Sequence, residues 1–96
     1  MKSFSVKEIN SKKDGIKKFN FDANVGVRFH PRQRKIAFKG VIVYNKNLGC
    51  VTVYRNRNTR GNAMFQNNPS TTFINTTAGE RIYNAFRKSA VGSKIA

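Results

Sequence analysis

Acidic side chains are the scarcest charged groups in this chain of 96 residues, which has four of them against 19 lysines and arginines. None of the four lies between Asp22 and Glu80, although that stretch holds nine basic residues. Charge of one sign repels itself and works against the compact state, so the surfaces of globular proteins normally mix both signs. The net charge of +15 therefore predicts an external polyanion as partner, and nucleic acid is the polyanion that we expect.

The shortage of titratable groups argues against an enzyme. General acid–base catalysis needs groups whose environments separate their pKa values, and the chain offers one histidine and four carboxylates. Asp14 is explained by a turn and Glu80 by a helix cap. One cysteine, one histidine and scattered acids do not make a metal site. We expect no catalytic residues, no metal site and no cofactor.

Long apolar runs are absent as well. No stretch of about 18 apolar residues could span a bilayer, and the N-terminus lacks the apolar segment of a secretory signal, so we expect no membrane partner. Cys50 is the single cysteine, which excludes an internal disulfide. It favours a reducing intracellular compartment, such as the cytoplasm or the nucleoid, or association with a virion.

Apolar residues alternate with polar ones through much of the chain. Every second residue from Phe19 to Phe29 is apolar, and the stretches 35–45 and 50–57 alternate in a similar way, which is typical of half-buried strands. Asp14-Gly15 suits a hairpin turn, and another strand is expected upstream of it. Because connections this short cannot join parallel strands, the sheet is predicted to be antiparallel.

The last third of the chain differs in character. Residues 58–70 are polar, asparagine-rich and basic, and such a segment cannot offset its ordering entropy by burial. Thr77 and Glu80 have capping-box spacing, and Ile82 and Phe86 then fall at helical spacing. The predicted fold is α+β: an antiparallel sheet of four or five strands, a long basic loop and one C-terminal amphipathic helix.

This fold is predicted to form one domain over residues 1–96. Within it we expect an N-terminal strand and hairpin turn in 1–15, the antiparallel sheet in 16–57, the flexible basic loop in 58–70, and a short strand with the C-terminal helix in 71–96. A sheet this small, covered by one helix, leaves apolar surface exposed. Self-association is therefore expected, most simply as a homodimer.

Cations and aromatic side chains are the candidate binding groups, because phosphates need spaced cations and unpaired bases stack on aromatic rings. The cations fall between Arg32 and Lys39, at the turn around Lys46, and after Tyr54. An antiparallel sheet can join these places into one basic rim. The candidate nucleic-acid-binding residues are Arg28, Arg32, Arg34, Lys35, Lys39, Tyr44, Lys46, Tyr54, Arg55, Arg57, Arg60 and Phe65.

The leading hypothesis is a non-enzymatic nucleic-acid-binding protein that favours single-stranded DNA or RNA and binds by phosphate neutralisation with aromatic stacking. Three alternatives stay open: a structural component of a virion or ribonucleoprotein particle, an architectural binder of double-stranded DNA, and a protein that docks on an acidic protein partner. The charge pattern does not separate DNA from RNA.

Two resemblances bear on these alternatives. The stretch from Val53 to Phe86, with its basic RNRNTRGN segment before a final helix, resembles the arm and closing helix of the HU/IHF family. That resemblance implies an arm that reaches into a minor groove. It covers the C-terminal third and lacks the proline of the arm tip, and the alternation from Phe19 to Phe29 departs from the paired helices of that family. The order of strands and helix is also similar to that of the Whirly single-strand binders.

Overall fold

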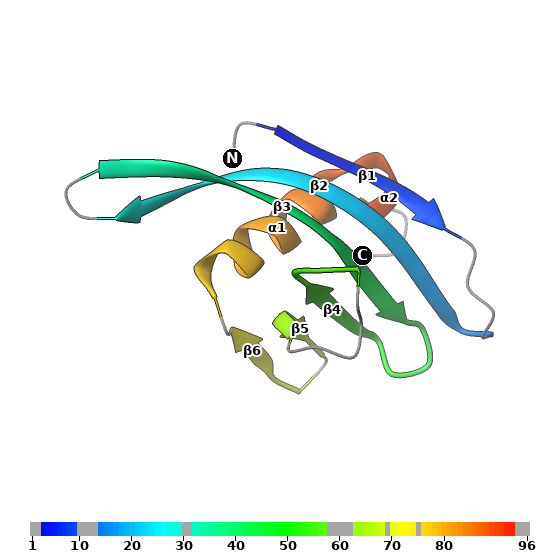
Figure 1. Ribbon diagram of the computed structural model, residues 1–96. Helices are drawn as coiled ribbons and strands as arrows, with labels where there is room; N and C mark the ends of the chain where they lie inside the picture. The colour runs from blue at the N-terminus through cyan, green and yellow to red at the C-terminus, as the bar shows by residue number, and fades with distance from the viewer. Residues whose placement is uncertain are drawn as a thin grey trace.

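The computed structural model describes residues 3–9, 14–29, 32–57, 63–68, 70–74 and 76–93. Six strands form one antiparallel sheet in chain order. They are β1 (Ser3–Ile9), β2 (Ile16–Phe29), β3 (Arg32–Asn45), β4 (Cys50–Tyr54), β5 (Ala63–Asn67) and β6 (Thr72–Ile74), and the helices α1 (Thr77–Lys88) and α2 (Ala90–Ser93) follow. The helices lie on one side of the curved sheet (Figure 1). The α+β class, the antiparallel sheet and the C-terminal helix are confirmed.

The sheet has six strands instead of the four or five predicted. The additional strand is β5, which forms within the segment expected to be a loop. Met64 and Phe65 explain this strand. Only 4% of Met64 and 2% of Phe65 is exposed, and burial of a large apolar side chain contributes about 1.5–3 kcal/mol. Together with the pairing to β4 and β6, this burial stabilises the five-residue strand. Residues 58–62 and 69 of the predicted loop lie outside the described residues.

The alternation of β2 is confirmed from Phe19 to Val25 and defines the two faces of the sheet. Phe19, Phe21, Ala23 and Val25 are buried, whereas Asp22 and Asn24 are exposed. The Phe19 ring packs against Phe86 of α1, with 5.1 Å between the ring centroids. The buried face of β2 therefore points toward α1 and builds the core. The opposite face is called the outer face below.

Helix α1 begins one residue earlier than the predicted capping box implies. Thr76, not Thr77, is the N-cap: its Oγ1 accepts a hydrogen bond from the amide of Gly79 at 3.0 Å. Thr76 has the extended backbone (φ −137°, ψ 148°) that an N-cap needs, whereas Thr77 is already helical. The helix ends at Lys88.

No helix among the described residues is long and apolar enough to cross a membrane.

The strands β2 and β3 extend beyond their neighbours. The pairing of β1 with β2 reaches only as far as Asn24, and the pairing of β4 with β3 begins at Val41. Beyond these points, residues 25–29 of β2 pair with 32–36 of β3. We call these two stretches the β2–β3 arm; they project past the helix in Figure 1. In the described structure the arm is a two-stranded ribbon on a six-stranded base.

Gly40 marks the place where β4 leaves β3. A Cβ atom at this position would lie 2.0 Å from the carbonyl oxygen of Tyr54 and 2.8 Å from that of Arg55. No side chain fits such an approach, so glycine permits the backbone after β4 to cross close to β3. This crossing brings Arg55 toward the side of the sheet on which α1 lies.

Candidate nucleic-acid interface

The β2–β3 arm concentrates positive charge. Its sequence contributes Arg28 from β2 and Arg32, Arg34 and Lys35 from β3, and residues 25–36 contain no acid. The register pairs Val27 with Arg34 and Phe29 with Arg32, and it pairs Arg28 with Gln33, so all four basic residues lie within one short length of ribbon. The Lys35 side chain is exposed. An isolated two-stranded ribbon has marginal stability in water. A ribbon that carries only positive charge is stabilised when an anionic partner offsets the repulsion between its side chains.

The outer face continues this positive surface onto β1 and the middle of the sheet. Lys7 and Lys39 are exposed on it and Lys18 is half-buried, while Asp22 is the one acid on this face in the described residues. Asp22 lies directly opposite Lys39 in the register and offsets part of its charge. Lysines therefore outnumber acids on the face that the helices leave open.

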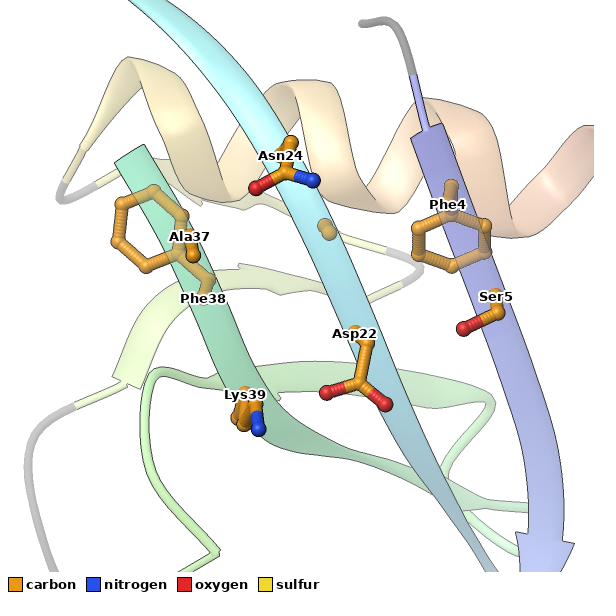
Figure 2. A pocket seen from close by; sticks show the side chains of 8 residues that line it. Phe4, Ser5, Asp22, Asn24, Ala37, Phe38 and Lys39 are labelled. Atoms are coloured by element: carbon orange, nitrogen blue, oxygen red, sulfur yellow. The ribbon is translucent and has the colours of Figure 1, made fainter. Parts of the chain in front are cut away.

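A shallow depression of about 310 Å³ lies on the outer face where β1, β2 and β3 run side by side. Figure 2 shows the side chains around it, with α1 behind the sheet. Ser5, Asp22, Asn24 and Lys39 surround the depression with polar groups, and the small side chain of Ala37 also lines it. Small and polar side chains in this place let an extended chain approach the sheet closely.

A second and larger pocket lies on the helix side, at the base of the arm. Its volume is about 470 Å³. Its lining residues come from β2, β3, the residue after β4, β5 and the start of α1: Val25, Gly26, Ile36, Phe38, Arg55, Met64, Thr76, Thr77, Ala78 and Arg81. None of these residues is acidic, and two of them are arginines. This pocket is called the base pocket below.

The two arginines of the base pocket are each held by a specific contact. The guanidinium of Arg55 lies over the ring of Phe38, with its central carbon 5.5 Å from the ring centroid. Nη1 of Arg81 donates a hydrogen bond to the carbonyl oxygen of Gly26. Both side chains are otherwise exposed, and a guanidinium has five N–H donors. Each arginine therefore keeps donors for a ligand after making its own contact.

The predicted cations that the structure describes lie at separate places along the sheet. Lys46 is exposed in the β3–β4 turn, at the opposite end of the 14-residue strand β3 from Arg32, and the molecule is 46 Å long. Arg57 is exposed shortly after the end of β4. Arg60 lies outside the described residues. Lys35 and Lys39 face outward as a binding surface requires, whereas Arg55 faces the helix side.

Two of the three predicted stacking aromatics are part of the core. Phe65 stacks on Tyr83 of α1 with 4.6 Å between ring centroids and 25° between the ring planes. Its ring is closed to a base, because β5 turns this residue inward instead of leaving it in a loop. Tyr44 packs against the core cluster from the helix side. Tyr54 alternates to the outer face, where it is half-buried.

Arg81 is a candidate that sequence reasoning missed. It lies on α1, next to the apolar stripe that was assigned to the core, and nothing in the helical periodicity sets it apart from Arg87 of the same helix. Its position in the base pocket depends on how α1 crosses β2, which is a tertiary property. Among the described residues, no three histidine, cysteine, aspartate or glutamate side chains gather where a metal ion could be held.

Comparison with known proteins gives no family for this chain. The geometry and the charge of the chain itself are therefore the grounds for a functional assignment. No protein-family model matches the chain, and neither a curated protein nor a solved structure matches it.

Proposed function

We propose that this chain is a non-enzymatic nucleic-acid-binding protein that neutralises phosphates with the β2–β3 arm and the outer face. The observation that carries the proposal is the composition of the arm, which places four basic residues and no acid on a ribbon that projects beyond the core. A projecting element of this charge has little to offer the stability of the fold. Its electrostatic cost is offset when counterions are displaced by a polyanion.

The proposal favours single strands, because the helices cover one side of the sheet and leave the outer face open (Figure 1). An extended strand can lie along such a face, with its phosphates at the exposed amines of Lys7, Lys35 and Lys39 and with Tyr54 offering a ring edge. If about five to seven phosphates are neutralised, the logarithm of the binding constant should fall with the logarithm of salt concentration with a slope of roughly −3.5 to −5.

Duplex DNA is the second candidate, and one specific observation favours it. The major groove is about 12 Å wide and admits a two-stranded β-ribbon, and the arm is such a ribbon with arginines on both strands. In this case the arm enters a groove and the outer face is not needed. The expected salt slope per phosphate is then steeper, at about −0.9 instead of about −0.7.

Fluorescence anisotropy with labelled single-stranded DNA, duplex DNA and RNA of equal length, over a salt series, tests the proposal. Tight and salt-steep binding that prefers single strands supports it, and a preference for duplex moves the assignment to the ribbon-in-groove alternative. Binding that does not depend on salt rules out phosphate neutralisation. Light scattering on the same samples gives the oligomeric state, for which we propose a dimer, and large assemblies without affinity for short oligonucleotides indicate a particle component.

A further inference from the structure

The base pocket is built by parts of the fold that the core already holds in place. Its floor consists of Val25, Phe38 and Met64, which are buried, and half-buried Ile36. Met64 is there because of a bulge: the register pairs Val53 with Phe65 but the next residue of β4 with Ala63, so Met64 has no partner on β4. Bulges of this kind redirect a side chain.

The start of helix α1 packs against Met64 and holds the floor of the pocket in place. The amide of Thr76 donates a hydrogen bond to the carbonyl oxygen of Met64 at 3.1 Å. A Cβ atom on Gly79 would lie only 2.7 Å from the Cβ of Met64, so the first turn of the helix rests directly on this residue. The pocket is therefore present before any ligand arrives, as is usual for small-molecule sites of about 300–1,000 Å³.

The lining has two chemically distinct parts. The floor is apolar and includes one aromatic ring, whereas the two charged lining residues are both arginines, Arg55 and Arg81. Guanidinium groups match phosphate geometry with paired N–H donors. A ligand that satisfies both parts has a flat apolar portion and a phosphate. The Arg55 guanidinium lies over the Phe38 ring and is exposed, so a planar ligand can stack on it.

We propose that the base pocket holds one nucleoside phosphate, with its base on the floor formed by Val25, Phe38 and Met64 and its phosphate at Arg55 and Arg81. This inference rests on the proposed nucleic-acid function, which supplies the ligand as an unpaired nucleotide of a bound strand. The same chemistry also describes a free nucleotide. The pocket lies on the helix side, so a strand on the outer face has to pass around the edge of the two-stranded arm to place one nucleotide in it.

Isothermal titration of the full chain at low salt tests the site, with adenosine monophosphate, adenosine and inorganic phosphate as separate probes. The monophosphate is expected to bind more tightly than either of its two parts. Arg81→Gln is expected to weaken its binding by about tenfold or more, because a hydrogen bond to a charged group is removed. Arg87→Gln is the matched control: it removes an exposed arginine from the same helix that does not line the pocket.

A second variant tests the pocket by shape and leaves the charge unchanged. Thr77 is exposed at the rim, and Thr77→Trp places a large ring in the opening. This variant is expected to weaken monophosphate binding with no change in net charge. Thermal unfolding is the check that the variant keeps its fold. If Arg81→Gln and Arg87→Gln weaken binding equally, or if the monophosphate binds no better than inorganic phosphate, the nucleotide pocket is ruled out.

Titration with a single-stranded oligonucleotide separates the two proposals. If the oligonucleotide binds with a steep salt dependence but the monophosphate does not bind, the pocket inference fails and the proposed function stands. If the monophosphate binds in the pocket but the oligonucleotide shows no salt-dependent binding, the proposed function fails and the pocket is a site for free nucleotides. Binding of both, with Arg81→Gln weakening the oligonucleotide as well, supports the pocket as part of the nucleic-acid site.

Discussion

The β2–β3 arm and the helix-covered base of the sheet use the same two strands for opposite purposes. In the base, β2 turns Phe19 and Phe21 toward α1 and buries them completely or nearly so. The arm continues the same strands past the end of α1 (Figure 1), and its sequence is rich in arginine and lysine. Stability is thus concentrated at one end of the hairpin and charge at the other. Substitutions at the two ends should change different measured quantities.

The largest expected effect is loss of stability in the base. Phe86→Ala removes a ring that is 1% exposed and packs on Phe19, and substitutions of this kind cost about 3–5 kcal/mol. Urea unfolding should show this loss in the free energy of unfolding. A loss below about 1 kcal/mol would mean that α1 does not close the core. The stability of the fold would then not be concentrated in the base of the sheet.

Neutralising the arm is expected to have the next largest effect, on binding instead of stability. Replacing Arg28, Arg32, Arg34 and Lys35 together by glutamine should reduce the magnitude of the single-strand salt slope by about 2.8, because each phosphate that is no longer neutralised accounts for about 0.7. The free energy of unfolding should change little. Anisotropy over a salt series gives the slope, and an unchanged slope would remove the arm from the interface.

A smaller effect should separate the two ends of β3. Lys35→Gln removes one exposed lysine from the arm, and Lys46→Gln removes one from the turn at the other end of β3. The first should reduce the magnitude of the salt slope by about 0.7, and the second should leave it nearly unchanged. Equal reductions in the two single variants would show that the bound strand runs along the whole of β3.

Phe65→Leu should affect stability and leave binding alone. The substitution keeps an apolar side chain in the core but removes the stack on Tyr83, and aromatic pairs contribute about 0.5–1.5 kcal/mol beyond their burial. Chemical unfolding measures the first quantity and anisotropy the second. A loss of affinity with unchanged stability would restore Phe65 as a stacking platform for bases.

The smallest predicted change concerns the start of α1. Thr76→Ala should lower the free energy of unfolding by about 1 kcal/mol, because the amide of Gly79 loses its acceptor. Thr77→Ala should cost less, because Thr77 is already helical and Thr76 holds the N-cap position. The reverse order of the two losses would place the helix start at the capping box that the sequence predicts.

Local pattern was sufficient to predict most of the fold. The alternation predicted the buried face of β2, which the structure confirms from Phe19 to Val25, and the spacing of Ile82 and Phe86 predicted the buried face of α1. The strand β5 was missed because its sequence, AMFQN, has no alternation and lies in polar surroundings. Its strand conformation comes from pairing with β4 and from contact with α1, which a local pattern does not contain.

The candidate site was predictable only in part, for a related reason. Net charge and the acid-free stretch predict a basic surface, and Lys35 and Lys39 are exposed in the structure. Which cations share a surface depends on where β4 leaves β3. That point is set by the close approach of the backbone at Gly40, and it sends Arg55 to the helix side. Arg81 joins Arg55 only because α1 crosses the same region.

Because β4 pairs with β3 only from Val41 onward, part of β3 is an open edge that affects aggregation. In the described structure β3 has no strand beside it over residues 32–40 on that side, and such an edge is a template for pairing with another copy. Positive side chains along an edge discourage this pairing by mutual repulsion. Removing the charges of the arm therefore also removes a guard against aggregation, so neutralised variants should be less soluble than the wild-type chain even though their folded stability is unchanged.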